Sequence, residues 1–226
     1  VTPSYEPGCK RILLSDDYYP ALARDNVDIL SAAVTALDGD NVCSDDGERR
    51  SVDALIWATG FDLSNLLAPM TVLGRAGRSL AEAWGDLPHA YLGTAVPGFP
   101  NLFMMTGPNT GLGHNSMIFM IESMVGMVVT CVERALAGQG AAVEVTPEAE
   151  AAANVDLQKR LRSAIWGSGC RSWYLDESGN NPIIWPGYTF QFWRRTRRVR
   201  WRDFSVTPLN PARLQPALTA HDDAAP

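Results

Sequence analysis

The sequence has few of the residues that build metal centres and disulfide frameworks. Its 226 residues include four cysteines, Cys9, Cys43, Cys131 and Cys170, and no Cys-x-x-Cys pair. None of the three histidines is spaced from a cysteine as zinc ligands are. These absences argue against the common zinc motifs, and we expect no metal site. The plain interpretation of the scattered cysteines is a reduced, cytoplasmic setting.

Positive charge and long hydrophobic runs are also scarce. The 19 lysines and arginines are outnumbered by 25 acidic residues, and the net charge of −6 argues against nucleic acid as the main partner. The one long apolar segment, Met117–Val132, contains Glu122 and is shorter than the roughly 20 residues of a membrane span. We therefore predict a buried core helix and no transmembrane segment. No signal peptide is visible, and a start at Val1 rather than Met fits an unusual start codon or a partial chain.

One glycine-rich stretch, residues 100–116, stands out against these absences. Its first half, residues 101–106, is a short apolar run bounded by turn residues, which predicts a buried strand. Two glycines then let the backbone approach a ligand closely, and Asn115 or Ser116 can cap the apolar helix that follows. A strand, a glycine turn and a helix N-terminus together can hold an anionic or electron-rich cofactor against backbone N–H groups.

The same stretch nearly matches a dinucleotide fingerprint. Gly111-Leu112-Gly113-His114-Asn115-Ser116 has the form Gly-x-Gly-x-x-Gly except for its last residue. The fingerprint also requires a second strand with an acidic end about 20 residues further on, and here that distance falls inside the predicted helix. We therefore reject a pyrophosphate site and retain a helix N-terminus that faces a partial negative charge. A catalytic base at the lone histidine of the loop is the less favoured interpretation.

The pattern along the chain predicts an α/β fold that begins with a β-meander. Short strands joined by tight turns are expected at residues 34–37, 42–44 and 49–58. The Asp46-Gly47 step is a strong hairpin signal. The motif Thr59-Gly60-Phe61 ends the third of these strands. The small residues at the end of the strand either let a flat ring approach the backbone or belong to an ordinary glycine turn.

Helices dominate the second half of the predicted fold. They are expected at residues 79–84, 116–137 and 147 to about 166. Thr146 as the cap and Pro147 at the first helical position mark the start of the last one. An aromatic and arginine-rich segment follows, and the residues from 205 onward have little to bury and are predicted to be disordered. We divide the chain into residues 1–142, a C-terminal extension at 143–204 and a tail at 205–226.

Several polar and aromatic groups have two interpretations each. Lys10-Arg11 could meet a phosphate and a reaction intermediate, or could be a solvated pair. Trp173 either stacks on a cofactor or is a core aromatic residue. A basic cluster accompanies two tryptophans and consists of Arg194, Arg195, Arg197, Arg198, Arg200 and Arg202. For this cluster, a solvated or ion-paired helix face is favoured over contact with nucleic acid or phosphate.

Taken together, the motifs occur in a specific order. They are Gly8-Cys9-Lys10-Arg11, Tyr18-Tyr19-Pro20, Arg24-Asp25-Asn26-Val27, Asp53 five residues before Ala58-Thr59-Gly60-Phe61, Gly107-Pro108-Asn109 and Ser172-Trp173-Tyr174. In this order they resemble the C-terminal part of flavin-containing, Baeyer–Villiger-type monooxygenases, over about residues 1–202. The Ala-Thr-Gly motif is widespread among flavoproteins with two dinucleotide-binding domains. The Lys-Arg and Ser-Trp-Tyr motifs narrow the resemblance from these flavoproteins in general to the Baeyer–Villiger-type monooxygenases.

The resemblance implies roles for individual residues. Arg11 matches the arginine that lies beside the flavin and stabilises the negatively charged peroxyflavin, as a fixed cation does for developing charge. Lys10 matches the lysine that faces the 2′-phosphate of NADP, and Trp173 matches a tryptophan that contacts NADP. Thr59 and Gly60 would lie at the junction of the flavin and NADP domains.

The glycine-rich loop would then face the flavin. By the resemblance, the residues at the pyrimidine edge of the flavin are Asn109, Thr110, Gly111, Leu112, His114 and Asn115. The implied fold consists of Rossmann-like remnants of FAD- and NADP-binding domains with a β-meander, followed by a helical and aromatic C-terminal extension. The implied activity is NADPH- and O2-dependent oxygenation of a ketone or a soft heteroatom.

The family pattern is incomplete in this chain. The chain has no Gly-x-Gly-x-x-Gly for FAD, no second glycine fingerprint for NADP and no Phe-x-Gly-x-x-x-His-x-x-x-Trp signature between them. We therefore expect a fragment that is inactive alone and needs the missing N-terminal half. One alternative is a non-catalytic subunit that works with a partner chain. A second is a flavin disulfide oxidoreductase, which the lack of Cys-x-x-Cys disfavours. A third is a basic interaction module at residues 194–202.

Overall fold

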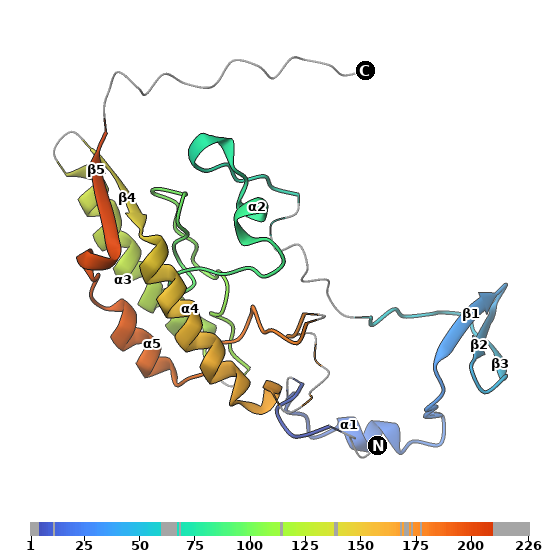
Figure 1. The fold of residues 1–226 in the computed structure, drawn as a ribbon. Helices are drawn as coiled ribbons and strands as arrows, with labels where there is room; N and C mark the ends of the chain where they lie inside the picture. Colours follow the sequence, from blue (N-terminus) through green and yellow to red (C-terminus); the bar gives the residue numbers. More distant parts are fainter. Residues whose placement is uncertain are drawn as a thin grey trace, which may run out of the picture. The chain divides into compact units, whose positions relative to one another are not determined.

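The structure is a computed structural model that describes residues 5–10, 12–59, 67, 69–113, 115–137, 140–167, 169, 172, 174–176 and 178–209. The contacts divide the chain into two compact units, one of residues 1–11 and 63–226 and one of residues 12–62. Within the described residues there is one antiparallel sheet in each unit, with strand orders β1-β2-β3 and β4-β5 (Figure 1). The α/β class predicted from the sequence is confirmed.

The smaller unit, residues 12–62, is built around the predicted β-meander. Its elements are α1 (Tyr18–Leu22), β1 (Val34–Asp38), β2 (Asn41–Ser44) and β3 (Arg49–Ser51). The β1–β2 turn places Asp38 opposite Asn41, and Gly39 adopts a φ of 58° there. A glycine suits that turn because a side chain would strain a positive φ.

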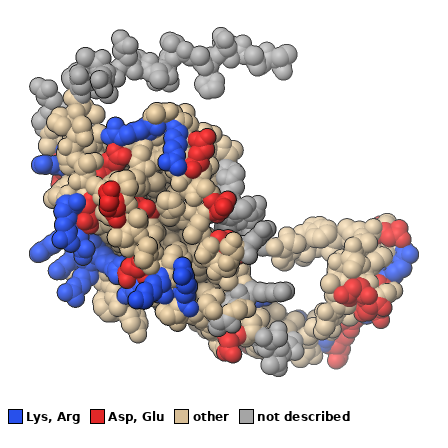
Figure 2. All heavy atoms as spheres, viewed as in Figure 1, with Lys and Arg blue, Asp and Glu red and all other residues tan. Residues whose placement is uncertain are grey.

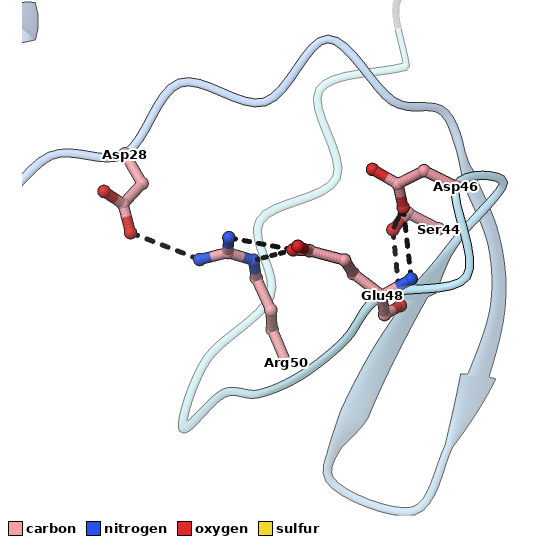
Figure 3. Close-up of polar contacts among 5 residues, drawn as sticks. All are labelled: Asp28, Ser44, Asp46, Glu48 and Arg50. Carbon is pink, nitrogen blue, oxygen red and sulfur yellow. Dashed lines mark hydrogen bonds and ion pairs between the residues drawn. The ribbon is translucent and has the colours of Figure 1, made fainter.

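Polar contacts rather than apolar burial hold the turn between β2 and β3 (Figure 3). The Ser44 hydroxyl and the backbone N–H of Glu48 both donate to Asp46, and these bonds hold the pKa of the Asp46 carboxyl below its usual value. Arg50 pairs with Glu48 at 3.0 Å and with Asp28 at 3.2 Å. Exposed ion pairs of this kind contribute little to stability individually.

The predicted strand at residues 49–58 is wrong over most of its length. β3 ends at Ser51, and the residues from Val52 to Thr59 form no regular element. Ile56 is 89% exposed and Trp57 65% exposed, and the smaller unit has no buried residue among those described. An apolar run becomes a central strand only where neighbouring strands and a covering layer bury it, and the described residues of this unit provide neither for the part of the run beyond Ser51.

The larger unit contains the remaining elements. They are η1 (Arg75–Gly77), α2 (Leu80–Trp84), α3 (Met117–Leu136), β4 (Ala141–Val145), α4 (Pro147–Arg162), η2 (Ile165–Gly167), α5 (Thr189–Thr196), η3 (Trp201–Asp203) and β5 (Phe204–Pro208). Helix α3 packs against α5 and β4. No helix within the described ranges has the length and apolar character that crossing a membrane requires.

One face of α3 supplies much of the core. The buried side chains at Met120, Met124, Met127 and Cys131 recur every three or four residues, as one face of a helix requires. Met120 and Met124 pack in a cluster with Trp185, while Cys131 belongs to a second cluster around β4 and β5. The prediction of a buried core helix is thereby confirmed for this face.

Both predicted caps are present. Ser116 caps α3 by accepting a hydrogen bond from the N–H of Phe119 at 3.4 Å. Thr146 caps α4 by accepting from Ala149 at 3.3 Å, with Pro147 at the first helical position. Such caps satisfy N–H groups that have no partner within the helix, which is why short sequence motifs identify them.

Two predicted boundaries shift in the structure. Helix α4 ends at Arg162 instead of near Trp166, and the 3₁₀ helix η2 follows it. Residues 205–208, assigned from the sequence to a disordered tail, belong to β5. They are ordered because every residue of β5 pairs with β4, from Ala141 opposite Pro208 to Val145 opposite Phe204.

The predicted strand at residues 101–106 is absent. Asn101 instead has a φ of 59° and attaches the segment to β4. Its side chain accepts from Val143 N–H at 2.8 Å and donates to the carbonyl of Ala141 at 3.1 Å. A single asparagine therefore contacts β4 at a place where the apolar pattern predicts a strand.

The scattered cysteines were expected to be reduced, and at least one of them is not. Cys9 is fully buried and disulfide-bonded, whereas Cys43 and Cys131 are free. The prediction of reduced cysteines is therefore wrong for Cys9.

Candidate functional site

The loop between residues 107 and 113 is fixed by a buried asparagine. Asn109 is 4% exposed and has a φ of 58°, a conformation that asparagine tolerates better than most residues. Its side-chain amide donates to the carbonyls of Asn181 at 2.6 Å and Ile184 at 3.2 Å, and its backbone N–H donates to Pro182 at 2.7 Å. Three donors of one residue thus hold the loop against residues 181–184.

Gly111 continues this attachment as a parallel bridge to Ile184. Its N–H donates to Ile183 at 2.7 Å, and its carbonyl accepts from the N–H of Trp185 at 2.9 Å. A Cβ at position 111 would lie 2.9 Å from the carbonyl oxygen of Ile183, which is closer than real Cβ contacts. The glycine is therefore required by a close approach of two protein segments.

Thr110 and Leu112 point into the protein rather than into solvent. Thr110 is 1% exposed, and its hydroxyl donates to the carbonyl of Gly107 at 2.7 Å. A Cβ at Gly93 would lie 2.1 Å from the methyl group of Thr110. Leu112 is 5% exposed and belongs to the core cluster of Met120 and Met124. The side chains of Thr110 and Leu112 therefore position the loop and are not available to a ligand.

The N-terminus of α3 lies directly after this loop. Asn115 is exposed, accepts from the N–H of Ser116 at 2.7 Å and donates to the hydroxyl of Thr189 at 3.3 Å. The helix is 20 residues long, so its N-terminal end carries the partial positive charge of the helix dipole. A partly negative ring edge would be stabilised there.

The structure brings together only some of the predicted site residues. Asn109, Thr110, Gly111, Leu112 and Asn115 lie in one loop at the start of α3. Lys10 is exposed, with its Nζ 4.7 Å from the ring centroid of Tyr5. Thr59 is exposed and belongs to the smaller unit. The remaining predicted residues lie outside the described residues, namely Arg11, Gly60, His114 and Trp173.

Sequence reasoning missed Asn181, which organises the segment opposite the loop. Asn181 is 2% exposed, and its side-chain oxygen accepts from the N–H groups of Ile183 at 3.0 Å and Ile184 at 2.9 Å. The signal was the Asn-Pro step at residues 181–182, which favours a turn nucleated by the asparagine side chain.

The arginine-rich segment forms a charged surface over α5 (Figure 2). Arg195 pairs with Asp156 at 2.9 Å, and this bond holds the pKa of the Asp156 carboxyl below its usual value. Arg197 lies over the ring of Trp193 at 4.9 Å from its centroid. These contacts match the ion-paired helix face that the sequence analysis favoured.

Curated relatives match nearly the whole chain. A Baeyer–Villiger monooxygenase of Pseudomonas aeruginosa is 42% identical over 95% of this chain and 42% of its own length. A Baeyer–Villiger monooxygenase of Streptomyces coelicolor is 40% identical over 95% of this chain and likewise 42% of its own length. The chain thus spans about two-fifths of the length of these relatives. No model of a protein family matches it.

Solved structures give the same result for the fold. A steroid monooxygenase bound to NADP matches with a TM-score of 0.78 and 29% identity, over 91% of this chain and 40% of the other. A cyclohexanone monooxygenase from Rhodococcus sp. Phi1 bound to NADP+ matches with a TM-score of 0.76 and 25% identity, over 89% of this chain and 39% of the other. Both similarities cover the chain and leave more than half of the other protein unmatched.

Proposed function

The chain belongs to the Baeyer–Villiger-type flavin monooxygenases, and we propose that it supplies one part of an FAD- and NADP-dependent enzyme that oxygenates a ketone or a soft heteroatom with O2. The observation that carries this proposal is the buried loop at the start of α3. Three donors of Asn109 and the bridge of Gly111 fix its backbone beside a helix N-terminus. Bound flavin would supply the redox and oxygen chemistry.

The protein's own residues would position the cofactors. The rigid loop would present backbone groups and the helix dipole to the pyrimidine edge of the flavin. Arg11 would hold a fixed positive charge beside the reacting edge of the ring, and Lys10 would contact the 2′-phosphate of NADP. Trp173 would pack against NADP, with Thr59 and Gly60 at the junction of the two nucleotide domains.

The exposed surface of helix α3 also supports the proposal that this chain assembles with another part of the protein. The face of α3 opposite the methionines carries exposed apolar side chains, with Ile118 at 62%, Val125 at 42%, Val129 at 47% and Leu136 at 75%. These positions lie on one stripe because they are spaced by seven, four and seven residues. Exposed apolar surface of this kind commonly marks an interface. We propose that this stripe is covered by the portion of the relatives that the chain does not match.

Reconstitution tests this proposal. The chain alone, supplied with FAD and NADPH, is expected to bind no stoichiometric flavin and to oxidise no NADPH above background. Co-expressed with the unmatched part of the Pseudomonas aeruginosa relative, it should bind FAD and consume NADPH in the presence of a ketone. A yellow polypeptide with one flavin per chain, purified without that partner, would contradict the requirement.

Variants of the apolar stripe identify the interface. Val125→Asp combined with Val129→Asp should abolish co-purification with the partner part, because two charges would be buried in an apolar contact. Val155→Asp is the matched control, since Val155 is 71% exposed on α4 and lies off this stripe. Equal loss in both variants would show that the stripe of α3 is not the contact.

The role of Arg11 is tested in the reconstituted protein. Arg11→Ala should abolish ketone oxygenation while NADPH binding persists, and Arg11→Lys should restore part of the activity because it keeps the positive charge. Arg194→Ala, on the exposed surface of α5, serves as the control for loss of a cation. Unchanged ketone oxygenation in Arg11→Ala would show that the assigned role is wrong.

The alternative is a non-catalytic subunit that assembles with a partner but performs no oxygenation. Its support is the same apolar stripe on α3, which predicts assembly whether or not a flavin is held. Assembly without flavin binding, in the presence of excess FAD, would favour this alternative over the enzyme.

A further inference from the structure

The loop at residues 107–113, which the proposed function places against the flavin, belongs to no helix or strand. Backbone outside regular elements must find its hydrogen-bond partners in other segments, and these partners decide whether it keeps one conformation. The described residues between 174 and 185 provide such partners. We call these residues the clamp segment, and they contact the loop at two places.

The first contact joins four consecutive carbonyl groups of the clamp segment to the loop. The carbonyls of Asn181 and Ile184 accept from the side-chain amide of Asn109, at 2.6 and 3.2 Å. Between them, the carbonyls of Pro182 and Ile183 accept from backbone N–H groups of the loop, both at 2.7 Å. Consecutive carbonyls of an extended strand point to opposite sides, so four of them meet one loop only where the chain bends.

The side chain of Asn181 holds this bend. Its oxygen accepts from the N–H of Ile183 at 3.0 Å and from the N–H of Ile184 at 2.9 Å, which draws the chain back over the asparagine. Its nitrogen Nδ2 is buried and has no hydrogen-bond partner among the described residues. Since only the oxygen is used, the fold requires a hydrogen-bond acceptor at this position.

The second contact is made by Tyr174, at the other end of the clamp segment. Its Oη lies 3.8 Å from the position that a Cβ of Gly113 would take, and its ring is buried in the core cluster that contains Leu112. Between the two contacts, the N–H of Asp176 donates to the carbonyl of Asn180 at 2.9 Å, and the N–H of Asn180 donates to Oδ1 of Asp176 at 2.8 Å. The chain therefore turns back at these two residues and reaches the loop a second time.

We propose that Asn181 is a positioning residue of the flavin site, because the bend that its side-chain oxygen holds fixes the backbone of the loop. This inference rests on the proposed function, in which the loop faces the pyrimidine edge of the flavin. Asn181 is 2% exposed, so it acts through the loop and not by contact with the ring. A loop that is already fixed loses less conformational entropy on binding, so Asn181 sets the affinity for FAD and not the rate of the chemical step.

Amide hydrogen exchange of the 226-residue chain tests the clamp without any cofactor. The N–H of Gly111 donates to Ile183, and the N–H of Trp185 donates to the carbonyl of Gly111, so both report on the first contact. In Asn181→Ala these two N–H groups should exchange at least about tenfold faster, relative to the amides of α3, whose exchange reports global unfolding. Unchanged protection of both groups would overturn the proposal.

Two further variants isolate the role of the oxygen. Asn181→Asp keeps the acceptor for both N–H groups of the bend, and exchange should stay within about threefold of the wild type. Asn154→Ala is the matched control, because the amide that it removes lies on α4 and donates to Glu150. Exchange in this control should stay within about twofold of the wild type. Exchange in Asn181→Asp as fast as in Asn181→Ala would overturn the role of the oxygen.

A third variant keeps the proposal testable if Asn181→Ala does not fold. Asn181→Ser has a shorter side chain, which places its oxygen farther from the two N–H groups of the bend. Exchange of the Gly111 and Trp185 N–H groups should then be at least about threefold faster than in the wild type. Unchanged exchange in Asn181→Ser would overturn the proposal.

The role in flavin binding is tested in the complex with the unmatched part of the Pseudomonas aeruginosa relative. Asn181→Ala should raise the Kd of FAD at least about tenfold, while ketone-dependent NADPH consumption per bound flavin stays within about twofold at saturating FAD. Asn181→Asp and Asn154→Ala should keep the Kd within about threefold of the wild type. A wild-type Kd in Asn181→Ala, or a loss of turnover per bound flavin, would overturn the positioning role.

The two experiments distinguish failure of this inference from failure of the proposed function. A wild-type complex that takes up no flavin contradicts the proposed function and, with it, the role of Asn181 toward the flavin. Exchange on the chain alone then still decides whether Asn181 holds the loop. A wild-type complex that binds FAD, together with an Asn181→Ala complex that binds it equally well, overturns the role of Asn181 alone.

Discussion

The side-chain amide of Asn109 donates to the backbone carbonyl of Asn181 at 2.6 Å, across 72 residues of sequence. Asn181 in turn uses its own side-chain oxygen to accept from Ile183 and Ile184. Two buried asparagines therefore join the loop before α3 to the segment before α5 through main-chain groups. Because both side chains are buried, the bonds are shielded from water.

The first prediction follows from this pair. Asn109→Ala should destabilise the protein by about 2–4 kcal/mol, because it leaves buried carbonyls without donors and puts alanine, which tolerates a φ of 58° less well than asparagine does, at this position. Asn109→Gly should cost less, since it removes the hydrogen bonds but tolerates the positive φ. Urea unfolding followed by circular dichroism measures both. Equal losses would show that the backbone conformation contributes nothing.

The second prediction compares two glycines that both have positive φ. Gly93 has a φ of 67°, and a Cβ there would lie 2.1 Å from the Thr110 methyl group and 2.8 Å from the Pro108 carbonyl oxygen. Gly77 has a φ of 75° and nothing within 4 Å of the corresponding position. Gly93→Ala should therefore prevent folding or cost more than about 3 kcal/mol, and Gly77→Ala about 1 kcal/mol. Thermal unfolding distinguishes them, and a Gly93→Ala as stable as Gly77→Ala would contradict the close packing of the loop.

The third prediction concerns the buried hydroxyl of Tyr91, which donates to Asp203 at 2.7 Å. Tyr91→Phe should cost about 1.5–3 kcal/mol at neutral pH, because the Asp203 carboxylate loses a donor. Burial, and then the bond to Asp203, raises the pKa of Tyr91 above its ordinary value of 10.0. When the pKa of a tyrosine is higher in the folded state than in the unfolded state, its contribution to stability is fully present at pH values below the unfolded pKa. That contribution is lost as the pH rises from the unfolded pKa through the folded pKa.

The stability difference between wild type and Tyr91→Phe should therefore be constant up to about pH 10 and then shrink by about 1.4 kcal/mol per pH unit. Urea unfolding between pH 7 and pH 11 measures this difference. A difference that stays constant across that range would mean that the tyrosine is not held in its neutral form by the fold.

The fourth prediction concerns the free thiols. Cys131 is fully buried, and burial raises its pKa from 9.0 to about 11, whereas Cys43 is partly exposed. Iodoacetamide at pH 8 should modify Cys43 in the native protein and leave Cys131 unmodified, because the thiolate is the reactive species. Peptide mass spectrometry reads both sites, and concentrated guanidinium chloride should make both react. Rapid native modification of Cys131 would contradict its burial in the core.

Local patterns predicted the elements whose stabilising contacts lie within a few residues. The caps Ser116 and Thr146 bind N–H groups three residues away, and the apolar repeat of α3 marks its buried face. The hairpin at Asp46-Gly47 likewise depends on neighbours within one turn. The motifs that identified the family are short segments of the same kind, so they were also readable from the sequence.

The tertiary structure decided what depends on distant partners. The apolar run ending at Ala58 is exposed because no strand among the described residues of the smaller unit lies beside it. The loop at Asn109 is rigid because Asn181 lies against it, and no local pattern connects two residues 72 positions apart. The sequence by itself determined α2, α3, the start of α4, the caps at Ser116 and Thr146, and the family. Only long-range packing decided which backbone groups are fixed at the start of α3 and which apolar faces remain uncovered.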